Sequence, residues 1–261
     1  MLGLGTVVTS IDSGQIYKEL SELSNYTDLD IHFDFSTLTG AHGDEVTAVT
    51  NLGKTGANND IDSNEGTPLL DRTTLSRSCV VFDGSNEVLD MANSYTTTGK
   101  PCTFFIVFQR DDVSNDYVAA NADDGATDFV RFTASGGTVQ TAMAGEDAVA
   151  TNTNNTNPTG TSINYTQVIN VPTVIAFRRD TAGSIALYAD NGLFIAQKTN
   201  AAIKAAANFT LGAIGGTTSG SLADLTGYIG EVGLYDVDIS EEEIITLTKE
   251  LSTKWGISRR S

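Results

Sequence analysis

Acidic side chains in two polar segments have the residue types that bind calcium. In the first segment, residues 60–66 (DIDSNEG), every second position offers an oxygen ligand: Asp60, Asp62 and Asn64. This spacing resembles the opening of a calcium-binding loop with Asp71 as its distal acid, although Glu65 stands where the sharp turn of such a loop needs glycine. Calcium is therefore a candidate cofactor at this segment.

The second segment, residues 121–128, gathers three acids around one glycine turn: Asp123, Asp124 and Asp128. Carboxylate oxygens on a turn are the ligands that calcium prefers. On so acidic a chain, however, clusters of this kind are more often solvated turns. Both interpretations stand for both segments.

Tyrosines supply the other residue type with a recognisable chemistry. A sugar-binding site usually combines an aromatic platform with Asp and Asn side chains that exchange hydrogen bonds with sugar hydroxyls. The sequence has four tyrosines that could provide such a platform: Tyr95, Tyr117, Tyr165 and Tyr228. Sequence alone does not bring any of them together.

Glu231 stands in the middle of an apolar strand-like run. A carboxylate there is costly unless it is paired. We expect an ion pair or hydrogen bond that belongs to the fold and not to a sugar site. The candidate partners are Arg131, Arg178 and Arg179.

Histidine and cysteine are scarce. His32 and His42 are too few for a histidine-rich metal site, and neither has an evident partner for nucleophilic catalysis; we expect them in a strand and in a turn. Cys79 and Cys102 are best interpreted as buried free thiols, with a single bridge between neighbouring strands as the alternative.

The charge balance limits the partners. The chain of 261 residues has 33 acidic and 15 basic side chains, a formal net charge of -18. Such a surface repels phosphate, so nucleic acid is an unfavourable partner. The sequence contains no apolar run of about 20 residues, so we expect no membrane insertion. The first residues also lack the pattern of a secretory signal, which predicts a protein made in a cytoplasm.

The central two hundred residues have the pattern of an all-β domain, because many short apolar runs are divided by Gly, Asn and Asp. The strands expected are residues 30–35, 46–51, 78–82, 87–91, 103–110, 117–120, 129–133, 139–142, 168–171, 174–179, 184–189, 193–198, 208–213 and 228–235. The triplet Asp190-Asn191-Gly192 predicts a hairpin turn. The unalternated apolar runs 104–108 and 174–177 predict central strands that are covered on both faces.

Both ends carry helix signals. Residues 1–28 are predicted to form an arm with a short helix, whose stripe of Ile16, Tyr17, Leu20 and Leu23 packs either on its own domain or on a neighbouring subunit. Residues 29–261 form the main domain. It closes with a helix over residues 240–255, because Ser240 and Glu243 make a capping box and Gly256 ends the periodic run.

The order of several segments resembles laminin G-like members of the concanavalin A-like lectin and glucanase superfamily. The resemblance lies in residues 80–89, 102–110, 174–179, 185–192, 211–215, 227–236 and the helix 239–255, and covers about residues 29–257. It implies a two-sheet antiparallel jelly-roll sandwich. The start, Met1 to Gly5 (MLGLG), is similar to that of tailed-phage virion proteins with this domain, marine ones especially.

The resemblance implies a non-enzymatic protein displayed on the surface of a phage particle, as a capsid decoration or as a tail or fibre component. The arm would anchor it to other virion proteins or to sister copies. The alternative is an adhesin that binds host surface polysaccharide, with or without calcium. The glycosidases of the superfamily carry a Glu-x-Asp-x-x-Glu strand motif that this sequence lacks, so we expect no hydrolase activity.

Overall fold

The apolar run at residues 104–108 forms the centre of β6 (Cys102–Arg110), in which every residue is buried. Because side chains alternate along a strand, Phe104, Ile106 and Phe108 face one core while Phe105 and Val107 face another. The first core fills the space between two stacked sheets. The second lies between one sheet and the C-terminal helix. The prediction of a central strand covered on both faces is confirmed.

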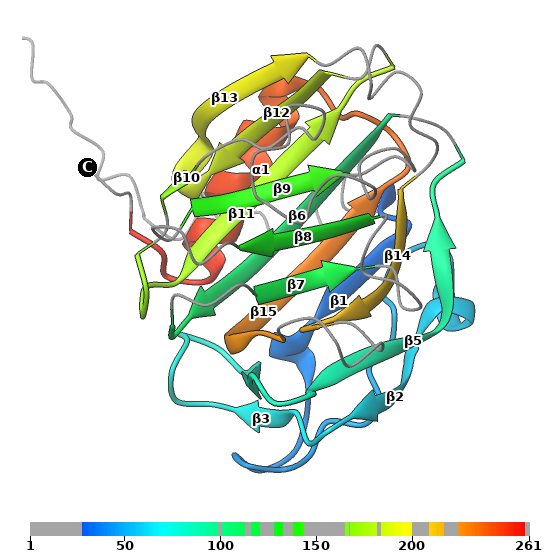
Figure 1. Ribbon diagram of the computed structural model, residues 1–261, viewed down its shortest axis with the longest axis vertical. Coiled ribbons are helices and arrows are strands. Elements are labelled where there is room, and N and C mark those ends of the chain that lie inside the picture. The colour runs from blue at the N-terminus through cyan, green and yellow to red at the C-terminus, as the bar shows by residue number, and fades with distance from the viewer. Residues whose placement is uncertain are drawn as a thin grey trace, which may run out of the picture.

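The computed structural model describes residues 28–98, 101–112, 116–120, 128–132, 138–143, 165–166, 168–181, 184–199, 209–216 and 224–258. Figure 1 shows these residues as two stacked sheets, with the seven-stranded sheet nearer the viewer and the helix α1 behind the eight-stranded one. All pairings between the described strands are antiparallel. The expected two-sheet antiparallel sandwich is confirmed.

The eight-stranded sheet has the order β13 (Leu193–Thr199), β12 (Ser184–Ala189), β11 (Thr173–Arg179), β6, β15 (Thr226–Tyr235), β4 (Cys79–Asp83) and β3 (Leu69–Asp71), and β1 (Ile31–Asp34) also pairs with β15. The seven-stranded sheet has the order β10 (Tyr165–Thr166), β9 (Thr138–Met143), β8 (Asp128–Phe132), β7 (Asp116–Ala120), β14 (Thr210–Ile214), β5 (Val88–Thr96) and β2 (Ile61–Glu65). In the described part of the chain, short 3-10 helices span Phe35–Thr37, Gly56–Asn59 and Asp190–Gly192.

The helix α1 (Glu241–Lys254) begins and ends where its sequence indicates. Ser240 accepts a hydrogen bond from the Glu243 backbone N–H, and the Glu243 side chain accepts one from the Ser240 N–H. Gly256 has a φ of 66°, which stops the helix. The helix packs on β11 and β12 and buries Ile244, Leu247 and Leu251 against the outer face of the eight-stranded sheet. Among the described residues, no helix has the length and apolar character required to cross a membrane.

The hairpin between β12 and β13 is also confirmed. Asn191 and Gly192 take φ values of 58° and 78°, the left-handed conformations that their residue types tolerate. Both cysteines are free and buried, as expected. Cys79 belongs to the core beneath α1 and Cys102 to the core between the sheets, so the two side chains face opposite sides of one sheet and the alternative bridge is excluded.

Two expected strands are wrong, residues 46–51 and residues 168–171. Residues 46–51 make one isolated bridge, between Val49 and Ile61, and the Asn51 side chain at their end accepts the backbone N–H groups of His32 and Gly53. Residues 168–171 form a turn in which Asn170 has a φ of 58°. The strands β2, β3 and β10 were not expected: β2 is polar and mostly exposed, and the other two are only three and two residues long. The predicted arm and helix, with Ile16, Tyr17, Leu20 and Leu23, lie outside the described residues.

Candidate functional site

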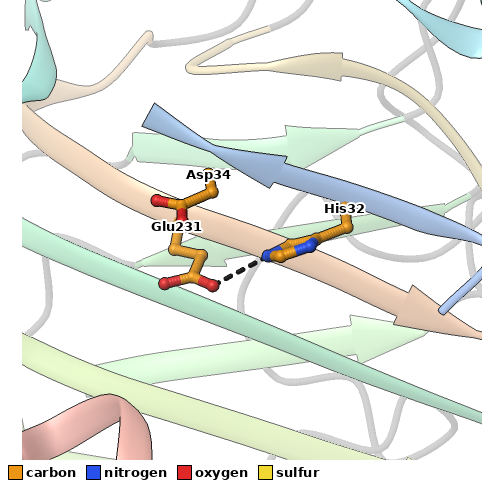
Figure 2. A group of neighbouring side chains, drawn as sticks. All are labelled: His32, Asp34 and Glu231. Carbon is orange, nitrogen blue, oxygen red and sulfur yellow. Dashed lines mark hydrogen bonds and ion pairs between the residues drawn. The ribbon is translucent and has the colours of Figure 1, made fainter. Parts of the chain in front are cut away.

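Three side chains with metal-binding atoms meet on the outer face of the eight-stranded sheet: His32, Asp34 and Glu231 (Figure 2). Among the described residues, this is the one group of three or more His, Cys, Asp or Glu side chains whose ligand atoms all lie within 4.8 Å of one another. Antiparallel pairing sets Asp34 directly opposite Glu231. The neighbours Ile31 and Phe33 face the core between the sheets, so His32 and Asp34 take the outer face.

A β-bulge in β15 brings Glu231 to that face. The pairing with β6 shifts register between Ile229 and Glu231, so Ile229 faces the core between the sheets although Glu231, two residues later, faces outward. The residue at the bulge is Gly230, where an added Cβ would lie 2.6 Å from a ring carbon of Trp255. Glycine therefore lets the end of α1 approach the strand.

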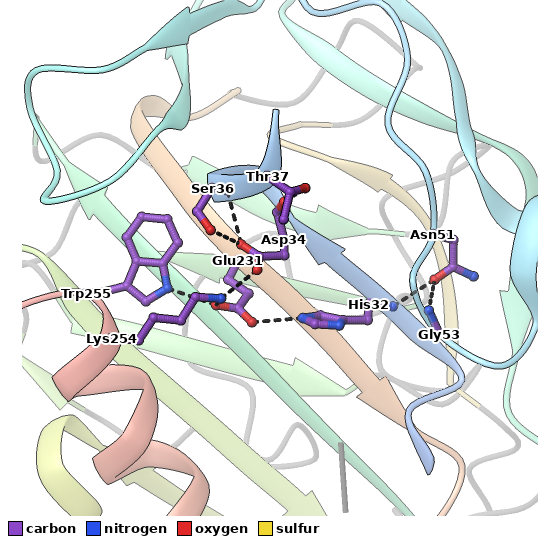
Figure 3. A network of polar contacts seen from close by, with 9 residues as sticks. All are labelled: His32, Asp34, Ser36, Thr37, Asn51, Gly53, Glu231, Lys254 and Trp255. Carbon is purple, nitrogen blue, oxygen red and sulfur yellow. Dashed lines mark hydrogen bonds and ion pairs between the residues drawn. The ribbon is translucent and has the colours of Figure 1, made fainter. Parts of the chain in front are cut away.

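The end of α1 completes the cluster (Figure 3). The Lys254 ammonium lies 2.6 Å from Asp34 Oδ2 and 2.7 Å from Glu231 Oε2. Trp255 Nε1 donates to Glu231 Oε2 at 2.8 Å. On the other oxygen, Glu231 Oε1 lies 2.8 Å from His32 Nε2. Ser36 donates its backbone N–H and its hydroxyl to Asp34 Oδ1.

The electrostatics agree with this geometry. Glu231 is fully buried, and burial by itself raises the pKa of a carboxyl group. The hydrogen bond from His32 and the charge of Lys254 outweigh that effect and lower the pKa of Glu231 to about 2. Glu231 is therefore an ion held by its partners.

The chemistry open to this cluster follows from the position of Lys254. A His and two carboxylates are suitable ligands for a divalent metal, but here the lysine ammonium already serves both carboxylates. Glu231 is also closed to any sugar, because its side chain is fully buried. The cluster joins α1 to β1 and β15. We call these five residues, His32, Asp34, Glu231, Lys254 and Trp255, the anchor cluster.

The expected pairing of Glu231 is confirmed, but its expected partners are wrong. Arg178 and Arg179 lie on β11, which β6 separates from β15, and Arg131 lies on the other sheet. Arg178 instead lies 3.9 Å from Asp238. The sequence signal for Lys254 was its place in the last turn of a capped helix, and the signal for the bulge was Gly230 within an apolar strand.

A second feature lies on the same outer face. Four side chains are direct cross-strand neighbours and form a row across four strands, here called the Tyr228 row: Leu69, Val81, Tyr228 and Gln109. Leu69, Val81 and Tyr228 are partly exposed. The Tyr228 ring packs at the border of the core beneath α1. The row thus combines an aromatic ring with apolar neighbours on one side and an amide on the other.

Hydrogen-bonding groups surround the Gln109 end of the row. The Gln109 amide donates to Asp111 Oδ1 at 2.9 Å. The turn at residues 168–171 lies beside it, because the Asn170 N–H donates to the Arg110 carbonyl. In this turn Val168 and Ile169 are 51% and 38% exposed, and Asn170 is exposed. This end of the sheet therefore presents carboxylate and apolar groups together, while the Gln109 side chain is itself buried and holds the Asp111 carboxylate.

The four tyrosines proposed as platforms are not brought together. Tyr95, Tyr117 and Tyr165 lie on β5, β7 and β10 of the seven-stranded sheet, with other strands between them, whereas Tyr228 lies on the eight-stranded sheet. The Tyr95 side chain packs against the core between the sheets, and its hydroxyl lies near the carboxylates of Asp30 and Asp236. Burial and these two carboxylates raise its pKa. Tyr95 thus ties the two sheets together.

The segment that resembles a calcium loop forms the strand β2 and not a loop. Asp60 accepts the Asn51 N–H, Asn64 donates to Glu45, and Asp71 accepts the N–H groups of Thr73 and Thr74. Within the described residues, Asp60, Asp62 and Asp71 do not form a close acidic group. Asp128 opens β8, and Asp123 and Asp124 lie outside the described residues. Calcium binding stays a prediction.

Both histidines lie where the sequence indicates. His32 is in β1, and His42 is in a turn, where its Nδ1 lies 3.5 Å from Asp71 Oδ2. What sequence reasoning missed is the pair Gln109 and Asp111. Gln109 lies near the end of an apolar strand, and apart from Thr103 it is the polar residue among the outward positions of that strand. This polar position in an apolar run was the signal available in the sequence.

No protein-family model matches the chain, and no curated protein matches it in sequence. Solved structures do share the fold. Domain 4 of AbnA, a GH43 extracellular arabinanase from Geobacillus stearothermophilus, in complex with arabinotriose, is 14% identical, with 85% of this chain and 98% of that chain covered and a TM-score of 0.56. The botulinum neurotoxin serotype G binding domain is 10% identical, with 88% and 54% covered and a TM-score of 0.60.

A botulinum neurotoxin type C structure described by its interaction with two ganglioside molecules is 12% identical, with 90% and 56% covered and a TM-score of 0.58. The chain therefore spans about half the length of these toxin structures. At such identities the likeness shows a lectin-like β-sandwich fold.

Proposed function

We propose that this chain binds carbohydrate without hydrolysing it, and that the Tyr228 row is the binding surface. The observation that carries the proposal is the partly exposed Tyr228 ring, which stands between apolar side chains and the hydrogen-bonded pair Gln109 and Asp111. Sugar sites are built from these parts: an aromatic face for the C–H side of the ring and a few polar groups that fix its orientation.

The expected binding mode follows from the order of the side chains across the sheet. A sugar ring stacks on Tyr228, and Val81 and Leu69 extend the apolar platform for a second ring. On the opposite side, the partly exposed Asp111 accepts from sugar hydroxyls, while the buried Gln109 amide holds the Asp111 carboxylate in place. Cross-strand neighbours lie about 5 Å apart, so the row has the width of an oligosaccharide and not of a single sugar.

The structural comparisons support the carbohydrate part of the proposal. The arabinanase domain is described in complex with arabinotriose, and the type C toxin is described by its interaction with gangliosides. A non-catalytic role is supported by the anchor cluster: Glu231, the carboxylate in the last strand, is fully buried and already has three partners.

A glycan array with the full chain tests the proposal, followed by calorimetric titration of each hit. We expect Tyr228→Ala to weaken binding at least about tenfold, the scale of one lost aromatic stacking contact. The matched control is Phe194→Ala, which removes an aromatic ring that is 47% exposed on the distant edge strand β13. Full binding by Tyr228→Ala, or equal loss in both variants, would contradict the proposal. Titration with and without calcium tests the cofactor.

Molar mass in solution serves as a second measurement. If Tyr228→Ala turned an oligomer into a monomer and no glycan bound to the parent chain, the row would be an interface between copies. That result would overturn the carbohydrate proposal.

The second candidate function, a component of a phage particle, is favoured by the opening residues Met1 to Gly5. In this setting the sandwich is displayed while residues 1–28 hold other virion proteins or sister copies. Deleting residues 1–24 is expected to release the protein from particles and leave the sandwich folded, as measured by sedimentation and circular dichroism. Retention on the particle would count against this role.

A further inference from the structure

We infer that the Tyr228 row selects neutral sugars and rejects anionic ones such as sialic acids, uronic acids and sulfated sugars. This inference rests on the proposed function of the row. Beside the Tyr228 row, the next row of outward positions on the same sheet consists of Asp83, Thr226 and Asp111.

Two carboxylates flank the platform. Asp83 is two residues beyond Val81 on β4, and Asp111 is two residues beyond Gln109 at the end of β6. Since side chains two residues apart share a face, both acids continue the outer face of the row. The strand between them carries Thr226, which pairs with Asp83 and accepts the Asp111 N–H at its carbonyl. A sugar on Tyr228 therefore lies about 7 Å, two strand residues, from this acidic row.

Carboxylates impose a chemical preference on a ligand. An ionised Asp accepts hydrogen bonds and donates none, so its partner must donate. The hydroxyls of a neutral sugar do so. A sugar carboxylate or sulfate would instead place its acceptor oxygens against those of the aspartates, and its negative charge would be repelled by theirs. The net charge of -18 on the chain adds to this repulsion.

Basic side chains of the surrounding segments are directed elsewhere. Arg72 donates to the Leu38 carbonyl and Arg77 to the Lys254 carbonyl. Lys254 serves the anchor cluster. Arg110, at the end of β6, is fully buried. The strand pairing sets the two aspartates beside the Tyr228 row, whereas each of these four cations has another partner or is buried.

The test compares matched glycan pairs that differ only by an acidic group, for example lactose and sialyllactose or a neutral and a sulfated oligosaccharide of one backbone. We expect the full chain to bind the neutral member about tenfold or more tightly at low salt, and the difference to shrink at high salt because screening weakens the repulsion. The double variant Asp83→Asn, Asp111→Asn keeps the side-chain size and one oxygen acceptor at each position, and removes both charges. It should bring the acidic member to within about threefold of the neutral one.

The double variant Glu241→Gln, Glu242→Gln is the matched control, because it removes two exposed carboxylates from the first turn of α1. It should leave the preference unchanged. Tighter binding of the acidic member by the parent chain would overturn the inference and leave the proposed function standing. A parent chain that binds neither member of any pair would instead overturn the proposed function. An equal shift in the control and the aspartate double variant would show a general charge effect and contradict the local one.

Discussion

The ammonium of Lys254 lies 2.7 Å from a carboxylate oxygen of Glu231, and this contact holds the last turn of α1 on the strand β15. The same ammonium serves Asp34 of β1. Three segments that are far apart in the chain therefore depend on one lysine.

Lys254→Met is expected to lower the free energy of unfolding by about 3–5 kcal/mol, the usual cost of removing one member of a buried ionic group. Methionine keeps an unbranched stem but leaves the carboxylates of Asp34 and Glu231 without their cation. Chemical denaturation measures the change. Lys249→Met, on the exposed side of the same helix, should cost little. Equal effects of the two variants would contradict the anchoring role.

Lys254→Ala is expected to turn the anchor cluster into a metal site. With the ammonium gone, His32, Asp34 and Glu231 offer one nitrogen and two carboxylates to a divalent ion. Zinc or cobalt at 100 times its Kd should then stabilise the variant by about 2.7 kcal/mol and leave the parent chain unchanged. Thermal unfolding with and without metal measures this. Adding Glu231→Gln should abolish the effect, and a metal response that survives it would argue against this site.

Glu231 makes the free energy of unfolding depend on pH. Its pKa falls from the ordinary value of 4.5 to about 2 on folding, so the unfolded chain takes up a proton more readily than the folded one. Its contribution is fully present above about pH 4.5 and is lost as the pH falls toward 2. The difference is about 3 kcal/mol at most. Unfolding curves from pH 7 to pH 2 should show this loss.

Glu231→Gln should be less stable at pH 7 and lose less stability on acidification than the parent chain. Because Glu231 is fully buried and its carboxylate is held by His32, Lys254 and Trp255, the folded variant should bind glycan as the parent does. Loss of binding at unchanged stability would contradict the structural role of this residue.

Both thiols should be inert in the folded protein. Burial, together with the neighbouring Asp71 charge, raises the pKa of the Cys79 thiol to about 12, and Cys102 is fully buried. Since the thiolate is the reactive form, a thiol reagent should label neither cysteine before unfolding and both after it. Rapid labelling of one thiol in the native protein would show that its environment is open.

Local signals predicted the elements that local chemistry determines. Three predictions were confirmed because the residues that determine each element lie within it: the apolar run of β6, the capping box of Ser240 and Glu243, and the Asn191-Gly192 turn. The failures have another origin. Strand β2 is polar and becomes a strand because β5 pairs with it, whereas residues 46–51 have a strand-like pattern but do not gain a continuous partner.

The site depended on topology even more strongly. Mid-strand burial indicated that Glu231 needs a partner, but the partners come from β1 and from the end of α1. A register shift at Gly230 also decides which way Glu231 faces. Tyr228 was a candidate from its residue type. Its neighbours Gln109 and Val81 follow only from the strand order, which sequence periodicity does not contain.

The bulge in β15 also has a bearing on how tolerance to substitution should be scored along this strand. Residues before Gly230 and residues after it follow opposite parity: Ile229 and Val232 point to the same core although an odd number of positions separates them. A mutational scan interpreted with one fixed alternation would assign half of β15 to the wrong side. The phase of the scan must change at Gly230, because Ile229 and Glu231 pair with the consecutive residues Phe108 and Val107 of β6. Deleting Gly230 would remove this change of phase and leave the side chains before and after it on their present faces.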